Sequence, residues 1–204
     1  MDITEQDLAV RLSALPHRSI VAIVGAPGAG KSTLAESLVA SQGGAALLPM
    51  DGFHLDDAVL RDLGRQERKG APDTFDAAGL WSTLKRIRAG EDTVAVPVFD
   101  RASEISHAAA RLIPARARLV LVEGNYLLLD RTPWQSLASL FDLTVMIDVP
   151  EAELRRRLTL RWQEHGLSEA EIARKLDRND IPNGRTVSEE SRDADLVLRP
   201  APAA

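Results

Sequence analysis

The chain has 204 residues, of which 45% are hydrophobic, and its formal net charge is −5. This size supports one well-buried domain, and the acidic balance excludes the basic surface on which nucleic-acid-binding proteins depend. Because the chain has no cysteine, disulfides and thiolate metal sites are also excluded. No apolar segment has the length of a signal-peptide core or of a membrane span, so we expect a cytoplasmic protein without membrane insertion.

Short apolar runs alternate with longer segments of helical period, starting with a helical pattern near the N-terminus. Helices are predicted over residues 4–15, 32–42, 76–89, 151–165 and 168–178. Strands are predicted over residues 19–24, 46–50, 93–98, 119–122, 143–148 and 196–198. Ser168 and Glu171 have the spacing of a capping box, and residues 179–185 have the composition of a turn. This alternation predicts an α/β protein with a mostly parallel sheet of about five or six strands, covered by helices on both faces.

A complete phosphate-binding loop follows the first predicted strand directly. Residues 25–32 read GAPGAGKS, which matches the pattern G-x-x-x-x-G-K-[ST]. In such a loop the main-chain N–H groups bind phosphate oxygens, the lysine reaches the β- and γ-phosphates, and the hydroxyl ligates Mg²⁺. The residues expected to bind the nucleotide are Gly25, Ala26, Pro27, Gly28, Ala29, Gly30, Lys31, Ser32 and Thr33, with Lys31 also catalytic and Ser32 also a metal ligand. We therefore expect the three-layer α/β/α fold of a P-loop NTPase, with ATP and Mg²⁺ as cofactors.

Two carboxylates follow predicted strands at the points where these strands end. Asp51 comes directly after the strand over residues 46–50, and Glu123 after the strand over residues 119–122. In an open α/β sheet, ligands bind at the carboxyl ends of the strands. Asp51 is therefore a candidate for the base that accepts a proton from an attacking hydroxyl, with a helix cap as the alternative. Glu123 is a candidate ligand of Mg²⁺ or of a water molecule, with a solvated strand-end acid as the alternative.

Charged segments elsewhere are candidates for contacts with phosphate and substrate. Arg157 and Arg161 are four residues apart, so they lie on one face of the helix predicted over residues 151–165. Phosphoryl transfer needs charge neutralisation, which makes both arginines candidates for a lid over the phosphates. The alternative is a solvated arginine face paired with acids. Residues 65–76 combine turn residues with charge and predict either a mobile substrate-binding segment or an ordinary surface loop.

Several motifs together resemble those of one superfamily of P-loop kinases. They read GAPGAGKS, MDGFH, RKGAPDTFD, PVFDR, LVEGNY and FDLTVMIDVPEAELRRRLTLRW, and they extend over about residues 20–198. The combination resembles the uridine kinase, phosphoribulokinase and bacterial pantothenate kinase superfamily, and most of all its short bacterial group of fructose transport system kinases. The resemblance implies a single kinase domain over residues 1–204, with an N-terminal helix over 1–18, an acceptor-binding insert over 51–118 and a helical lid over 151–180.

The resemblance also implies roles for single residues. Asp51 matches the general base and Glu123 the acid near Mg²⁺, while Arg157 and Arg161 match the lid region. The residues that match contacts to the acceptor substrate are His54, Lys69, Phe99, Asp100 and Arg101. Residues 179–185 fall where the superfamily often contacts adenine.

The expected function is ATP-dependent phosphorylation of a hydroxyl group on a small metabolite. A sugar such as fructose suits the polar residues near Asp51, and a nucleoside or pantothenate is the alternative acceptor. An alternative of another class is a regulatory nucleotide-binding module with weak catalytic activity. A GTPase is disfavoured because the chain has no Asn-Lys-x-Asp tetrapeptide to read guanine. The one protein partner considered is a second copy of the chain in a homodimer, and no nucleic acid is expected as a partner.

Overall fold

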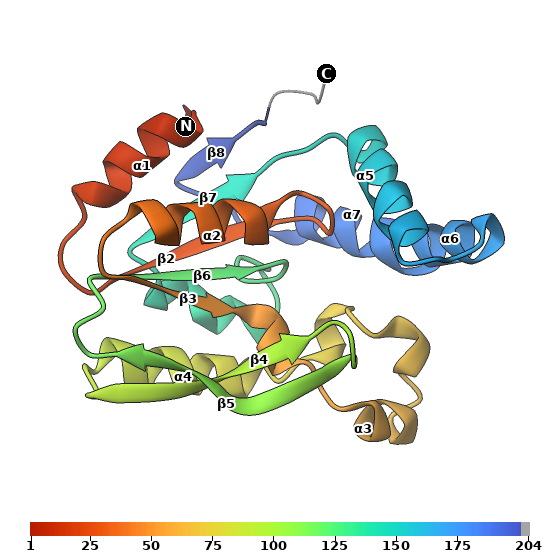
Figure 1. Ribbon diagram of the computed structural model, residues 1–204, viewed down its shortest axis with the longest axis horizontal. Coiled ribbons are helices and arrows are strands. Elements are labelled where there is room, and N and C mark those ends of the chain that lie inside the picture. Colours follow the sequence, from red (N-terminus) through yellow and green to blue (C-terminus); the bar gives the residue numbers. More distant parts are fainter. Residues whose placement is uncertain (201–204) are drawn as a thin grey trace.

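A six-stranded sheet forms the middle layer of the computed structural model, which describes residues 1–200 (Figure 1). Its strand order is β1-β8-β7-β2-β6-β3, and every neighbouring pair is parallel. The strands are β1 (Asp2–Ile3), β2 (Ser19–Gly25), β3 (Ala45–Pro49), β6 (Leu119–Gly124), β7 (Leu143–Ile147) and β8 (Leu196–Leu198). The expected parallel sheet of five or six strands is thus confirmed.

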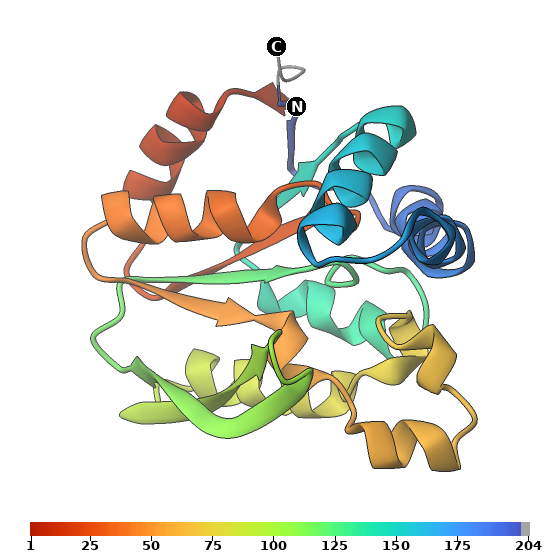
Figure 2. The same cartoon turned by 45° about the vertical axis from the view of Figure 1, so that its right-hand side comes forward.

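Helices cover both faces of this sheet, with α1 and α2 on one face and α4 on the other (Figures 1 and 2). The α-helices are α1 (Glu5–Ser13), α2 (Lys31–Ser41), α3 (Asp57–Asp62), α4 (Ala77–Arg88), α5 (Glu151–Glu164), α6 (Glu169–Lys175) and α7 (Ile181–Glu190). Shorter 3₁₀-helices cover Met50–Phe53, Gln66–Arg68, Pro72–Thr74 and Trp134–Leu140, and a π-helix covers Leu176–Asp180. Over residues 1–200, no helix combines the length and the apolar character needed to cross a membrane.

The central strand β2 is buried along its whole length. Ile20 and Val24 pack into the core beneath α4, whereas Val21 and Ile23 pack into the core beneath α1 and α2. A continuous apolar run of this kind is typical of a parallel strand that is covered on both faces. The loop that follows β2 therefore starts from one of the most firmly packed parts of the molecule.

The predicted helix ends agree with the observed caps. The capping box of Ser168 and Glu171 is present at the start of α6. Asp76 caps α4, because its carboxylate accepts a hydrogen bond of 2.8 Å from the N–H of Gly79. Gly90 follows shortly after this helix with a φ of 80°.

The strand predicted over residues 93–98 forms, but its assignment to the parallel sheet is wrong. It is part of β4 (Thr93–Asp100), which pairs antiparallel with β5 (Ile105–Pro114) in a separate two-stranded sheet. Pro97 lies where the register of this pair shifts, and proline has no N–H to donate to a neighbouring strand. Exposed and buried residues alternate along the first half of β4, so only one of its faces is buried. This pattern is typical of an antiparallel pair with one solvated face and not of a strand inside the main sheet.

The prediction of a turn over residues 179–185 is also wrong, because these residues are helical. Residues 179 and 180 end the π-helix, and α7 begins at Ile181. Pro182 stands in the first turn of α7, which continues directly from the π-helix. Because proline has no N–H, the carbonyl of Arg178 one turn earlier has no helical donor from residue 182 and accepts a hydrogen bond from Arg68 instead. Gly184 packs against the phosphate-binding loop, since a β-carbon there would lie 3.4 Å from the β-carbon of Ala26. The Asn, Pro and Gly residues thus serve a helix start and a close approach.

The glycine that ends β6 should be sensitive to substitution. A β-carbon at Gly124 would lie 2.4 Å from the β-carbon of Met50, so neighbouring atoms must move to admit it. We expect Gly124→Ala to lower the free energy of unfolding by about 1–3 kcal/mol in urea denaturation. The control is Gly43→Ala, because nothing lies within 4 Å of a β-carbon there. Equal effects of the two substitutions would contradict the packing described.

Candidate active site

A polar pocket of about 360 Å³ opens at the carboxyl ends of β2, β6 and β3, which are neighbours in the sheet. Side chains from α5, from β4 and from the segment before α4 complete its wall. The expected site residues that line it are Pro27, Gly28, Gly30, Lys31, Ser32, Thr33, Asp51, His54, Lys69, Phe99, Arg101, Glu123 and Arg161. The structure therefore brings most of the expected nucleotide and acceptor residues to one cavity.

The loop between β2 and α2 bends at two glycines with positive φ angles, 82° at Gly28 and 97° at Gly30. A β-carbon at Gly28 would lie 3.0 Å from Leu158 of α5, so both the conformation and the space favour glycine. Because α2 begins at Lys31, the N–H groups of its first turn have no helical partners and point toward the loop. Such a loop at a helix N-terminus attracts anions, and phosphate above all.

The Lys31 side chain is buried at the base of the pocket, where the residue is only 9% exposed. Its ammonium donates a hydrogen bond of 3.1 Å to the carbonyl oxygen of Ala26. Burial lowers the pKa of Lys31, while the carboxylates of Glu123 and Asp51 raise it. The ammonium is thus held under the loop by one carbonyl and by two nearby acids.

The two acids expected at the strand ends approach each other across the pocket. Glu123 is 5% exposed, and its pKa is raised by burial and then by the charge of Asp51, against the opposing charges of Lys31 and Arg101. Asp51 pairs with Arg101 of the β4–β5 turn, with 2.7 Å between Oδ2 and Nη2. The site therefore alternates acidic and basic groups, and each charge depends on its neighbours.

Ser32 and Glu123 supply a hydroxyl and a carboxylate to the same pocket. The Ser32 hydroxyl is close enough to Glu123 to oppose in part the rise in the pKa of that carboxyl group. Within residues 1–200, no group of three or more His, Asp or Glu side chains could hold a metal ion alone. Mg²⁺ prefers oxygen ligands and commonly takes only one or two protein groups beside water and phosphate oxygens. This pair of donors fits Mg²⁺ bound together with a nucleotide.

His54 packs between two phenylalanine rings on the side of the pocket where contacts to an acceptor are expected. Its ring centroid lies 4.0 Å from that of Phe75 and 4.6 Å from that of Phe99. Nδ1 lies 2.8 Å from the carbonyl oxygen of Asp51, and a carbonyl can only accept, so Nδ1 carries the proton. Burial lowers the pKa of His54, which keeps the ring neutral and leaves Nε2 as a hydrogen-bond acceptor.

Lys69 joins three parts of the acceptor side. Its ammonium lies 2.7 Å from the Asp57 carboxylate of α3 and donates a hydrogen bond of 2.7 Å to the carbonyl oxygen of Glu104 in the β4–β5 turn. It also lies 5.3 Å from the centroid of the Phe99 ring. These contacts hold the hairpin, α3 and the segment before α4 around one cation.

Some expected site residues do not line this pocket. Arg157 contacts the loop from outside, with its Nη1 donating a hydrogen bond of 3.3 Å to the carbonyl oxygen of Ala29 and its Nε paired with Glu153. The carboxylate of Asp100 accepts hydrogen bonds from Ala102 and Ser103 in the hairpin turn. Gly25, Ala26 and Ala29 form the loop backbone behind the pocket wall. The roles assigned to Arg157 and Asp100 remain predictions.

Several lining residues were not named individually from the sequence, although half of them fall in the segments 65–76 and 179–185 for which contacts were expected. They are Asp57, Gln66, Gly70, Phe75, Glu104, Asn125, Leu158, Trp162, Lys175, Asn179, Asp180 and Asn183. Asn179 and Asn183 are four residues apart, so they lie on one face of a helix. The prediction of a turn over residues 179–185 concealed this relation. Asn125 stands two residues after Glu123 at the end of β6, where the strand-end rule applies as well.

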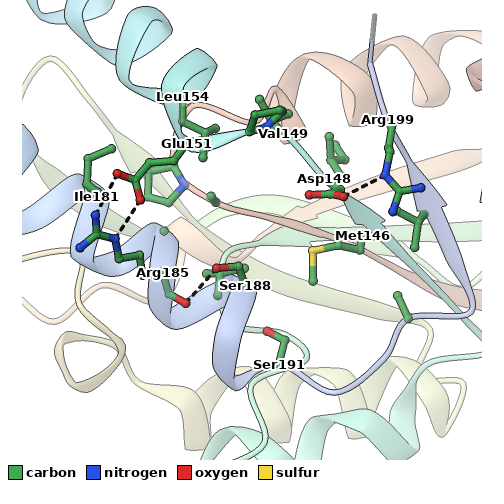
Figure 3. Close-up of a pocket in the computed structure, with 18 of the residues that line it drawn as sticks. Met146, Asp148, Val149, Glu151, Leu154, Ile181, Arg185, Ser188, Ser191 and Arg199 are labelled. Carbon is green, nitrogen blue, oxygen red and sulfur yellow. Dashed lines mark hydrogen bonds and ion pairs between the residues drawn. The ribbon is translucent and has the colours of Figure 1, made fainter.

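A second cavity, of about 430 Å³, lies behind the phosphate-binding loop and touches it at Ala26 and Pro27. Figure 3 shows that ion pairs close two of its sides, Glu151 with Arg185 at 2.8 Å and Asp148 with Arg199 at 2.9 Å. Its wall is more apolar than that of the first pocket and includes side chains of β7, α5 and α7. No sequence motif predicts this cavity, because its walls come from segments that are far apart in the chain.

Comparisons with known proteins agree on one group. A sequence profile of the Phosphoribulokinase / Uridine kinase family matches residues 20–203. The protein YggC of Escherichia coli K12, itself uncharacterized, is 37% identical over 188 residues, which cover 89% of this chain and 78% of YggC. A pantothenate kinase from Bradyrhizobium sp. strain BTAi1 is 31% identical over 175 residues, which cover 77% of this chain and 52% of the enzyme.

Solved structures resemble this fold closely. A crystal structure from Silicibacter sp. TM1040, which carries the provisional name fructose transport system kinase, has a TM-score of 0.89 and 37% sequence identity. The match covers 96% of this chain and 98% of that one. YFH7 from Saccharomyces cerevisiae, at 20% identity, has a TM-score of 0.84 and supports the fold alone.

The buried imidazole should leave a signature in the pH dependence of stability. The pKa of His54 in the folded chain lies below its ordinary value of 6.5, so the folded state binds fewer protons than the unfolded state. Its contribution to stability is therefore present above pH 6.5 and is lost as the pH falls through the folded pKa. In urea titrations from pH 6.5 down to about 5, the wild type should lose stability more steeply than His54→Gln. Parallel pH profiles would show that the ring is not held neutral by burial.

Proposed function

Because the chain belongs to the Phosphoribulokinase / Uridine kinase family, we propose that it transfers the γ-phosphoryl group of Mg·ATP to a hydroxyl group of a small metabolite. One observation carries the proposal: Lys31, Asp51 and Glu123 share a pocket with a phosphate-binding loop. The triphosphate would lie along this loop, with its terminal phosphate at the Lys31 ammonium. The acceptor would enter from the side of His54 and Lys69.

The proposed reaction is an in-line displacement. The carboxylate of Asp51 accepts the proton of the acceptor hydroxyl, whose oxygen forms a bond to the γ-phosphorus while the bond from that phosphorus to the β,γ-bridging oxygen breaks. The products are the phosphate ester and ADP. Ser32 and Glu123 are the residues that would hold Mg²⁺, and the ion would supply neutralisation of phosphate charge.

Arg101 has to be considered in this scheme, because it already occupies Oδ2 of Asp51. The guanidinium lies on the exposed tip of the β4–β5 hairpin, with 61% of its side chain accessible, so it can move at little cost in packing. An acceptor hydroxyl that reaches Asp51 would take the place of this ion pair or share the carboxylate with it. Arg101 would then be free to interact with the acceptor or with the transferring phosphate.

The acceptor side of the pocket suits a hydroxyl-rich molecule. His54 offers Nε2 as an acceptor, and Asn125 and Gln66 offer amide groups that both donate and accept. A sugar such as fructose would satisfy these groups, in keeping with the name of the Silicibacter protein. A nucleoside or pantothenate is the alternative, supported by the family profile and by the pantothenate kinase relatives.

The direct test is a product screen with the purified chain. Mg·ATP is incubated with sugars, nucleosides and pantothenate in separate reactions, and mass spectrometry detects an acceptor that has gained one phosphoryl group. We expect turnover with at least one hydroxyl compound. Tight ATP binding without any phosphorylated product would instead support a regulatory nucleotide-binding module.

Substitution of the proposed base should separate catalysis from binding. We expect Asp51→Asn to lower kcat by a factor of about 10²–10⁴, because proton acceptance is lost while the side chain keeps its size. The dissociation constant of Mg·ATP, measured by calorimetry, should stay within about threefold of the wild-type value. Asp62→Asn on the exposed end of α3 is the matched control, with unchanged turnover. Normal turnover by Asp51→Asn would remove the assigned base.

Two arginines of α5 provide a matched test of charge neutralisation. Both are exposed, but Arg161 lines the pocket, whereas Arg156 does not line it and is paired with Glu153 at 2.7 Å. We expect Arg161→Ala to lower kcat by a factor of about 10²–10³, because donors aimed at the transferring phosphate act mainly in the transition state. Arg156→Ala should leave kcat within about twofold, since exposed ion pairs contribute little. Similar kinetics for both variants would argue against Arg161 as a phosphate ligand.

A further inference from the structure

Residues 68–72, here called the strap, cross the rim of the pocket between α3 and α4. In both ribbon views they lie beneath the C-terminal helices α6 and α7 (Figures 1 and 2). The strap includes Gly70, whose φ of 96° exposes its carbonyl to neighbouring side chains. Tyr126 donates a hydrogen bond of 2.6 Å to this carbonyl, which fixes the strap from below.

Two asparagines from the π-helix and α7 hold the strap from the other side. Asn179 donates a hydrogen bond of 2.9 Å to the carbonyl oxygen of Lys69, and Asn183 donates one of 3.2 Å to that of Gly70. Asn183 also donates to Asn179 at 3.2 Å and accepts from Arg68 at 3.1 Å. Asn183 is 2% exposed, so a buried polar cluster with matched donors and acceptors joins the two segments.

The π-helix carries Asn179, which contacts the strap, and its neighbour Asp180, which contacts α5, the helix of Arg157 and Arg161. A π-helix in a protein is rare and is often found at a functional site. Asp180, next to Asn179, accepts a hydrogen bond of 2.8 Å from the indole of Trp162 in α5. Leu158, which also belongs to α5, packs against Gly28 of the phosphate-binding loop. A continuous set of contacts therefore runs from this loop through α5 and the π-helix to Lys69.

Lys69 is held at both ends by this arrangement. Its carbonyl is bound by Asn179, and its ammonium is bound by Asp57 and by the backbone of Glu104. Any displacement of the π-helix relative to the hairpin must move or strain this residue. Its side chain lies on the acceptor side of the pocket, where the proposed substrate would bind.

We propose that Asn179 and Asn183 are positioning residues, which tie Lys69 of the acceptor side to the proposed lid region so that nucleotide binding at the loop orders the strap. This inference rests on the proposed function, because it assigns a regulation to the same site. The chemistry is local: two side-chain amides bind two strap carbonyls, and both amides are carried by helical segments that pack against α5. Coupling of this kind is reciprocal, so an ordered strap also favours nucleotide binding.

Amide hydrogen exchange of residues 66–76 tests the proposal on the full chain. Three proteins are compared, each with and without the magnesium complex of β,γ-imido-ATP: the wild type, Asn179→Asp and Arg178→Ala. Asn179→Asp keeps the size of the side chain but removes the amide donor. Arg178→Ala changes the exposed neighbour on the same turn, whose backbone carbonyl, not its side chain, contacts Arg68.

Without nucleotide, Asn179→Asp should speed exchange in the strap by about fivefold or more, with global stability in urea close to that of Arg178→Ala. With nucleotide, the strap should slow in the wild type and in Arg178→Ala, but not in Asn179→Asp, while the nucleotide dissociation constants stay within about threefold. Nucleotide protection that survives in Asn179→Asp would overturn the proposal, as would unchanged exchange in its nucleotide-free form. Failure of the wild type to bind nucleotide would instead contradict the proposed function. The comparison without nucleotide would still show whether the Asn179 hydrogen bond orders the strap.

Discussion

The site depends on the burial of one ammonium group beneath a loop of main-chain amides. Lys31 is taken out of water at the end of a fully buried strand, and Glu123 and Asp51 offset the cost of that burial. Removal of one of these three charges would change the pKa of the groups that remain, because each of them contributes to the electrostatic environment of the others. A triphosphate with Mg²⁺ would enter this arrangement as a further set of charges, with its anions facing the loop and its cation facing the acids.

The fold supplies the geometry through strand order. Because β2, β6 and β3 are neighbours, their carboxyl ends place the loop, Glu123 and Asp51 side by side without any long excursion of the chain. The acceptor side is built differently, from a hairpin, a short helix and the strap, which meet at Lys69. The expected phosphate side is thus formed by neighbouring strands of the main sheet. The expected acceptor side is formed by short segments that are joined by polar contacts.

The sequence predicted the parts of the molecule that local rules determine. The loop motif, the strand-end acids and the capping box of α6 each depend on residues close together in the chain, and the structure places them as expected. The strand predicted over residues 93–98 pairs outside the main sheet with β5, which was not predicted, because strand pairing is a long-range property. Residues 179–185 were assigned to a turn because Asn, Pro and Gly favour turns, whereas here they serve a helix start and close packing. The hydrogen bonds from Asn179 and Asn183 to the strap were not predicted for the same reason, since these two residues lie on one face only when they are helical.

A crystal structure of the chain with Mg²⁺ and β,γ-imido-ATP tests the central claim most directly. The account predicts the γ-phosphate within hydrogen-bonding distance of Nζ of Lys31, with Mg²⁺ near Ser32 and Glu123 and with the carboxylate of Asp51 facing the γ-phosphorus from the side opposite the bridging group. A triphosphate bound away from the loop, or an Asp51 carboxylate turned away from the terminal phosphate with the acceptor side filled, would contradict it.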